Sequence, residues 1–121
     1  MWNRSGLRSQ NLCAELGGNA VAEPATSGYG LIVNATTVGM RGEDALAELP
    51  LGPEGFGAGQ VVVDLVYGAG PSPLLRAAAE RGASTVDGVE VLVRQGALSL
   101  EAWVGVQPPL EVMREAARAA C

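Results

Sequence analysis

The run QVVVDLVY, residues 60–67, constrains the fold more than any other segment of this chain. Valine is a β-branched residue that favours strands, and three valines in succession leave no alternation of polar and apolar side chains. Such a strand is buried on both faces, which is typical of a parallel sheet with helices on either side. We therefore expect an α/β fold.

The rest of the chain alternates between helix-like and strand-like patterns. Capping residues and terminating glycines mark the helices; Ser72 is expected to cap one of them, with Pro73 at its first helical position. Short apolar runs bounded by glycine or polar residues, such as residues 31–35, are typical of buried strands. We predict helices or helical turns over residues 5–18, 44–49, 72–82, 87–104 and 108–120, and strands over residues 1–2, 31–35, 60–67 and 84–86. This alternation predicts a mainly parallel sheet flanked by helices.

The composition excludes several classes of protein. The chain has 121 residues, 48% of them hydrophobic and 17% charged, which fits one globular domain. A net charge of -5 without a basic cluster disfavours binding to nucleic acid. Neither a membrane span nor a signal peptide is predicted, and the two cysteines suggest no disulfide framework, so we expect a cytoplasmic protein. Because histidine is absent, we exclude Ser-His-Asp and Cys-His catalysis and predict no metal site.

Ligands of parallel α/β sheets bind beyond the carboxyl ends of the strands. The segments at those ends are NRS (3–5), NATTVGM (34–40), DLVY (64–67) and DGV (87–89). Arg4 and Arg8 are one helical turn apart and are able to hold a phosphate at a helix N-terminus. Arginine at this place accommodates the 2′-phosphate of NADP, whereas an acidic residue favours NAD. The alternative is an ordinary polar N-terminus with solvated arginines.

Two polar side chains stand among apolar neighbours. Tyr67 is able to donate a hydrogen bond to a carboxylate or hydroxyl, or else lies at the edge of the core with its hydroxyl in water. Gln95 lies on an apolar helical face, and a buried amide without partners costs about 1–3 kcal/mol. We therefore expect Gln95 to be buried and to serve a polar ligand or a backbone group. Asp64 and Asp87 are most simply a strand-end group and a helix cap.

The ordered motifs NRS, NATTVGM, DLVYGAGPSPLL and DGVEVLVRQGALSLEAWVG resemble the C-terminal part of NADP-dependent shikimate dehydrogenases. The resemblance covers nearly the whole chain and implies that residues 1–121 form an incomplete Rossmann-like NADP-binding domain with C-terminal helices. The first strand and the glycine-rich loop of that fold have no counterpart here. The chain departs from the family pattern mildly, at Ser5, Ala69, Ser72 and Val91.

The resemblance also implies roles for individual residues. The cofactor NADP would contact Asn3, Arg4, Ser5, Arg8, Ala35, Thr36, Leu65 and Gly88, with Thr37 and Met40 nearby. The substrate, shikimate or 3-dehydroshikimate, would contact Tyr67 and Gln95. Family members carry their catalytic lysine and aspartate in a preceding substrate-binding domain, so no catalytic residue is expected in this chain.

Three functions stay open on the sequence. The first is the C-terminal portion of a shikimate dehydrogenase, which in complete form interconverts shikimate and 3-dehydroshikimate with NADP in aromatic amino acid biosynthesis; the isolated chain would be inactive. The second is a non-catalytic nucleotide-binding or interaction module that self-associates through open sheet edges. The third is an enzyme with a related nucleotide domain, such as a glutamyl-tRNA reductase, although DLVY and VLVRQ favour the shikimate family.

Overall fold

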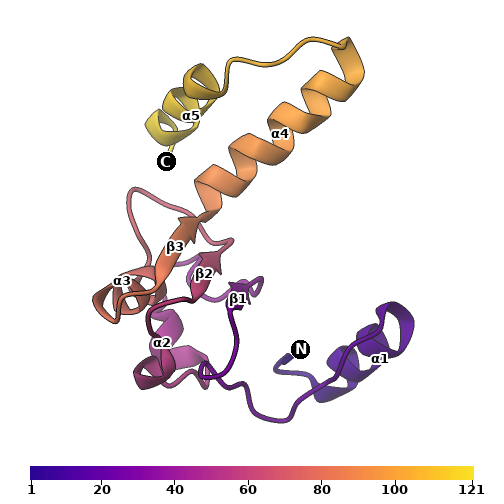
Figure 1. Ribbon diagram of the computed structural model, residues 1–121, viewed down its shortest axis with the longest axis vertical. Coiled ribbons are helices and arrows are strands. Elements are labelled where there is room, and N and C mark those ends of the chain that lie inside the picture. The colour runs from indigo at the N-terminus through magenta and orange to yellow at the C-terminus, as the bar shows by residue number, and fades with distance from the viewer.

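The computed structural model describes residues 1–121 without a gap. Three parallel strands form one sheet in the order β1-β2-β3, so that β2 is central (Figure 1). The strands are β1 (Leu31–Asn34), β2 (Val61–Asp64) and β3 (Ser84–Asp87). The helices are α1 (Gly6–Leu16), α2 (Ala45–Glu48), α3 (Pro73–Glu80), α4 (Gly88–Val104) and α5 (Leu110–Ala119), with a short 3-10 helix, η1 (Pro53–Gly55). The predicted α/β class and parallel sheet are confirmed.

The hydrophobic core lies between β2 and the helices α2 and α3. Val62 of β2 is fully buried there. The other buried members of the core are Ala45, Leu49, Phe56, Leu74, Leu75, Ala78 and Ala83. The hydroxyl of Ser72 caps α3 by accepting a hydrogen bond from the Leu75 amide, and Pro73 takes the first helical position, as predicted.

The other face of β2 is more open than the sequence predicts. Val61 and Val63 are only half-buried. Successive side chains of a strand point to opposite faces, and α2 and α3 both pack on the Val62 side. The prediction of burial on both faces is therefore wrong for these two valines.

Strand β1 forms an edge of the sheet. It pairs with β2 on one side only. Leu31 is 60% exposed and Val33 is 49% exposed. The apolar run predicted the position of this strand correctly but its burial wrongly, because hydrophobicity does not reveal whether a neighbouring segment covers a strand.

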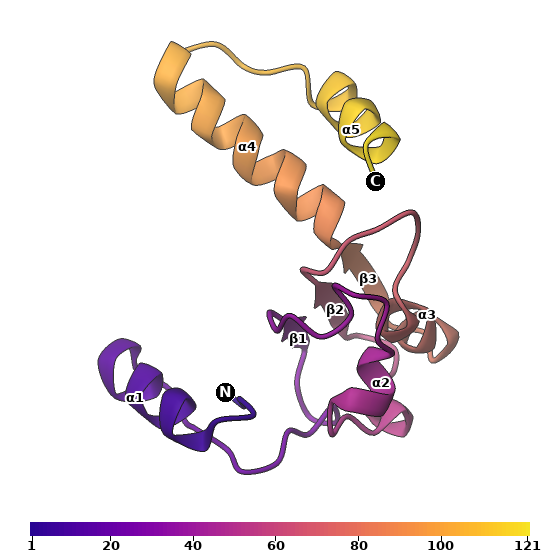
Figure 2. The ribbon, with the colours of Figure 1, turned by 180° about the vertical axis from the view of Figure 1, so that it is seen from behind.

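The first two residues are not a strand, contrary to the prediction. The Met1 carbonyl accepts a hydrogen bond from the Val21 amide at 2.9 Å, and the Trp2 indole donates one to the Ala22 carbonyl at 3.1 Å. These bonds tie the N-terminus to the segment after α1, and the half-buried Trp2 packs against the edge of the core. Helix α1 lies apart from the sheet, on the β1 side, in both views (Figures 1 and 2).

The exposed side of α1 carries two leucines. Leu12 and Leu16, which the sequence places on one helical face, are both exposed, and the buried residues are Ser9 and Cys13. Gly17 ends the helix with a φ of 83°, as its position predicts. The sequence thus predicts the boundaries of α1 well, but the buried side of this helix is that of Ser9 and Cys13 and not that of its two leucines.

Helix α4 leaves the end of β3 and projects beyond the sheet, and α5 packs back against it (Figures 1 and 2). The buried side chains of α4, Val89, Val93 and Ala97, all lie within its first ten residues. Trp103 near its far end is 81% exposed. The projection explains this difference, because only the start of α4 lies against the sheet. No helix of the chain combines the length and apolar character that crossing a membrane requires.

Candidate functional site

Three polar side chains stand in one row at the carboxyl end of the sheet. The strand register pairs Asn34 with Asp64 and Asp64 with Asp87. Asp64 is 1% exposed, and Asn34 is also buried. Because buried polar groups need hydrogen-bond partners, Asn34 and Asp64 have to be paired within the chain.

The Asp64 carboxylate accepts three hydrogen bonds. The donors are the Asn34 amide Nδ2 at 2.9 Å, the Val66 backbone amide at 3.1 Å and the Ser72 hydroxyl at 2.6 Å. The sequence singled out Asp64 only as a strand-end group and Ser72 only as a helix cap. The one available signal was that Asn34 and Asp64 begin the segments NATTVGM and DLVY, which were expected at the carboxyl ends of two strands, and it did not reveal Ser72 as a partner.

The NATTVGM turn is organised by side chains that follow β1. The Asn34 Oδ1 accepts hydrogen bonds from the Thr36 amide at 3.1 Å and from the Thr36 hydroxyl at 2.8 Å. The Thr36 hydroxyl oxygen in turn accepts one from the Val38 amide at 3.2 Å. Ala35 lies exposed at the start of this turn. The turn therefore presents Thr36 in a fixed orientation beyond the strand end.

Two neighbouring cavities lie beyond β1 and β2. One measures about 310 Å³ and is lined by Thr36, Met40, Leu65, Val66 and Tyr67. The other measures about 150 Å³ and is bordered by the loops 39–45 and 64–73. Tyr67 and Val66 line both cavities. The predicted site residues Thr36, Leu65 and Tyr67 are thus brought together around one mainly apolar cavity.

Gly88 lies against the backbone of Leu65, one of the residues that line the larger cavity. It is buried, and a Cβ atom on it would stand 2.5 Å from the carbonyl oxygen of Leu65 and 3.1 Å from that of Asp64. The start of α4 therefore packs directly on the backbone that leaves β2, and only glycine fits there. Gly88 and Leu65, which were predicted as parts of one cofactor contact, are neighbours.

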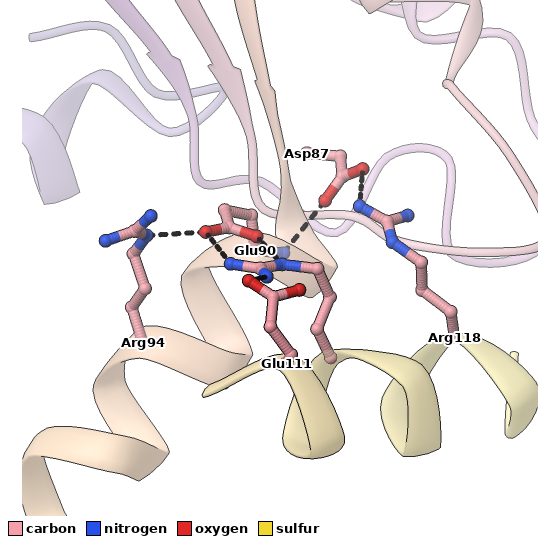
Figure 3. A network of polar contacts seen from close by, with 6 residues as sticks. Asp87, Glu90, Arg94, Glu111 and Arg118 are labelled. Carbon is pink, nitrogen blue, oxygen red and sulfur yellow. Dashed lines mark hydrogen bonds and ion pairs between the residues drawn. The ribbon is translucent and has the colours of Figure 1, made fainter. Parts of the chain in front are cut away.

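Ion pairs fasten α5 to the beginning of α4 (Figure 3). Glu90 contacts Arg94 at 2.5 Å and Arg114 at 2.7 Å, and Arg118 contacts Asp87 at 2.9 Å. The hydrogen bond from Arg114 is the main cause that lowers the pKa of Glu90 to about 2, and the same contact raises the pKa of Arg114. The row residue Asp87 and the helix that carries Gly88 are held in place by this network.

Gln95 does not join the cavity. It is exposed, and its Nε2 donates a hydrogen bond to the Leu92 carbonyl at 3.1 Å. The prediction that Gln95 is buried is wrong, because Gln95 lies on the opposite side of α4 from its buried neighbours Val93 and Ala97. The predicted backbone partner is nevertheless present. From Gly88 to Gln95 the helix rises by about 10 Å.

The N-terminal candidates form a separate group at the start of α1. The side chains of Arg4 and Arg8 are exposed, and neither is in an ion pair. The Asn3 Oδ1 accepts a hydrogen bond from the Ser5 amide at 2.9 Å, whereas the Ser5 side chain makes no cap contact. The two cations are therefore free to meet an anion at a helix N-terminus.

Known proteins match this chain over the segments just described. Residues 88–118, which include nearly all of α4 and α5, match the family model of the shikimate 5′-dehydrogenase C-terminal domain. The shikimate dehydrogenase (NADP(+)) of Archaeoglobus fulgidus is 46% identical over 87 residues, which are 72% of this chain and 32% of that protein. The enzyme of the same name from Synechococcus sp. (strain JA-3-3Ab) is 50% identical over 93 residues. This chain belongs to the shikimate dehydrogenase family. It spans about a third of the length of these relatives.

Solved structures of the shikimate dehydrogenase family share the fold. The Thermus thermophilus enzyme, in complex with NADP(H) and shikimate, matches 99% of this chain and 45% of its own with a TM-score of 0.82 and 37% identity. A 5-ketofructose reductase of Gluconobacter matches with a TM-score of 0.85 but 22% identity, which shows likeness of fold alone. The Rossmann-like fold class predicted from the motifs is confirmed.

Proposed function

We propose that residues 1–121 are a partial Rossmann-like NADP-binding domain with C-terminal helices, and that this chain is the cofactor- and substrate-binding C-terminal portion of a shikimate dehydrogenase. The complete enzyme would interconvert shikimate and 3-dehydroshikimate with NADP, in the cytoplasm. The observation that carries the proposal is the cavity where Thr36, Leu65 and Tyr67 meet beside Gly88. Family membership and the NADP(H) and shikimate bound in the Thermus thermophilus relative support it.

The residues around the cavity fit a nicotinamide ring. Leu65 and Val66 give it an apolar wall, and Gly88, which has no side chain, lets the start of α4 pack directly on the Leu65 carbonyl. Thr36 borders the same space from the NATTVGM turn, and Ala35 precedes it as an exposed residue. NADP, when bound, would supply the acceptor for a hydride, and this chain would hold and orient its ring.

The phosphate end of the cofactor fits the other group of residues. Arg4 and Arg8 have no carboxylate partner, and Asn3 and Ser5 shape the turn that precedes α1. A 2′-phosphate would receive charge-assisted hydrogen bonds from the guanidinium groups. This pairing would favour NADP over NAD.

Two side chains would bind the substrate. The Tyr67 hydroxyl is exposed and makes no hydrogen bond within the chain, so it is able to donate one to a hydroxyl or carboxylate. The Gln95 amide would exchange its bond to Leu92 for a bond to the same ligand.

We further propose that the isolated chain binds NADP and shikimate but does not catalyse hydride transfer between them. Oxidation of a hydroxyl by hydride transfer also needs a group that takes the hydroxyl proton. The chain contains no lysine, and its one buried carboxylate, Asp64, already accepts three hydrogen bonds. The proton acceptor would be supplied by residues outside these 121.

Calorimetric titration of the purified chain tests this proposal. NADPH and shikimate are each expected to bind with a stoichiometry of one, and the mixture of NADP+ and shikimate is expected to yield no NADPH. Binding of neither ligand would refute the binding function. Formation of NADPH at an ordinary enzymatic rate would refute the statement that the isolated chain is inactive.

A second candidate function rests on the edge of the sheet. β1 presents an unpaired edge and exposes Leu31 and Val33, which favours self-association through that strand. A non-catalytic interaction module of this kind would need neither NADP nor shikimate. Nucleic acid is not a proposed partner, in view of the net charge of -5.

A further inference from the structure

The loop between β2 and α3 carries two of the proposed site residues, Leu65 and Tyr67, and is anchored at both ends to one carboxylate. The Asp64 Oδ1 accepts a hydrogen bond from the Val66 amide at 3.1 Å, where the loop begins. The Asp64 Oδ2 accepts one from the Ser72 hydroxyl at 2.6 Å, where the loop ends. The two oxygens of a single buried side chain thus close this loop.

Little else holds the middle of the loop. Gly68 and Gly70 have open space where a side chain would be, with no atom within 4 Å of an added Cβ. Glycine also leaves the backbone its full range of conformations. The orientation of Tyr67 therefore depends on the anchored ends of the loop.

The same carboxylate orders the second turn of the site through Asn34. The Asn34 Nδ2 donates to Asp64 at 2.9 Å, which turns its Oδ1 toward the next turn of chain. That oxygen accepts hydrogen bonds from both the amide and the hydroxyl of Thr36. Asp64 thus acts on Thr36 through one intermediate side chain.

We infer that Asp64 is a positioning residue of this site, which sets the Leu65–Tyr67 turn directly and the Thr36 turn through Asn34. This inference rests on the proposed function for the identity of the ligands, but not for the geometry of the two turns. A carboxylate suits the task because it only accepts hydrogen bonds and has two oxygens for three donors. Ser72 completes the arrangement, since its oxygen also accepts a hydrogen bond from the Leu75 amide at 3.3 Å and so joins the loop to α3.

Two substitutions break this arrangement at different points. Asp64→Ala removes all three hydrogen bonds, whereas Ser72→Ala removes only the bond at the far end of the loop together with the cap of α3. Ser72→Thr keeps the hydroxyl and is the conservative rescue. Asp44→Ala is the matched control, because Asp44 caps α2 through the Leu46 amide and does not touch the loop.

Amide hydrogen exchange, followed by NMR, measures the turns themselves. We expect Ser72→Ala to raise the exchange rate of the Val66 amide by about ten-fold or more, with Ser72→Thr close to the wild type. Asp64→Ala should raise the rates of both the Val66 and the Thr36 amides. Asp44→Ala should change neither. If Ser72→Ala and any folded Asp64→Ala protein leave the Val66 amide at its wild-type rate, the positioning role is wrong.

Ligand titration then separates the two proposals. If the wild type binds NADPH and shikimate, Ser72→Ala should weaken the binding of shikimate by about ten-fold and Ser72→Thr should restore it. Unchanged affinity in Ser72→Ala would overturn the positioning role while the proposed function stands. If the variants show the expected changes in exchange rate while the wild type binds neither ligand, that result would refute the proposed function and leave the role of Asp64 in the two turns intact.

Discussion

Gly88, the first residue of α4, packs so closely on Leu65 that an added Cβ would stand 2.5 Å from the Leu65 carbonyl oxygen. This contact joins the helix to the strand end that lines the cavity. Gly88→Ala should therefore push α4 away from β2 and lower the free energy of unfolding by about 1–3 kcal/mol, a typical effect of overpacking. Urea denaturation measures the loss, and the affinity for NADPH should fall with it.

Gly96 offers a matched control in the same helix. An added Cβ there has only the Met113 methyl nearby, at 3.6 Å, which is ordinary contact. Gly96→Ala should raise the free energy of unfolding by about 0.5–1 kcal/mol, because alanine favours the helix. Effects of the same sign in the two variants would contradict the assignment of Gly88 as a close-packing position.

Arg4→Ala should weaken the binding of NADP+ far more than that of NAD+. Arg4 is exposed and unpaired at the start of α1, and a charge-assisted hydrogen bond to the 2′-phosphate would be worth about 1.5–3 kcal/mol, or roughly ten-fold to a hundred-fold in affinity. Calorimetric titration with both cofactors measures the difference. Arg81→Ala removes another exposed arginine at the end of α3 and serves as the control. Equal losses for NADP+ and NAD+ would remove the argument for a phosphate contact.

Tyr67→Phe should weaken shikimate binding and leave NADPH binding near the wild-type value. The substitution removes only the hydroxyl, which has no partner within the chain. A lost hydrogen bond to a ligand is expected to reduce affinity by about five-fold to ten-fold. Saturation-transfer NMR with shikimate measures it. A parallel loss for NADPH would mean that the ring of Tyr67, and not a substrate bond, was disturbed.

The sequence predicted helix caps better than it predicted which side chains are buried. Ser72 and Asp87 were identified as helix caps because capping depends on local spacing, and both side chains accept the expected backbone amides. The exposure of Gln95 and Trp103 was not foreseen, because helical periodicity defines an apolar face but not whether anything packs on it. The Asn34–Asp64 bond was also missed, since it depends on the pairing of two strands that are distant in sequence.

The depressed pKa of Glu90 predicts an acid-sensitive contact between α4 and α5. A carboxylate whose folded pKa is about 2 contributes stability that is complete above its ordinary pKa near 4.5 and is lost as the pH falls toward 2. Glu90→Gln should lower the free energy of unfolding by about 1 kcal/mol at neutral pH, and this deficit should shrink over that acid window. Thermal unfolding measured from pH 7 down to about pH 2 tests the trend.

Glu111→Gln is the control for that experiment. Glu111 also pairs with Arg114, at 2.6 Å, but its side chain is 80% exposed, so its removal should cost less than about 0.5 kcal/mol. A deficit for Glu90→Gln that stays constant down to pH 2 would contradict the contribution of the ionised Glu90 carboxylate.

The open edge of β1 predicts concentration-dependent self-association of the isolated chain. Leu31 and Val33 are exposed on a strand with an unpaired side, and such an edge is able to pair with the same edge of a second copy. Sedimentation velocity over a range of concentrations should show a species larger than the monomer, and Leu31→Lys should abolish it, because a lysine on an edge strand opposes pairing. Leu98→Lys replaces an equally exposed leucine on α4 and should leave association unchanged. A wild type that stays monomeric throughout, or equal effects of the two lysines, would exclude β1 as the associating edge.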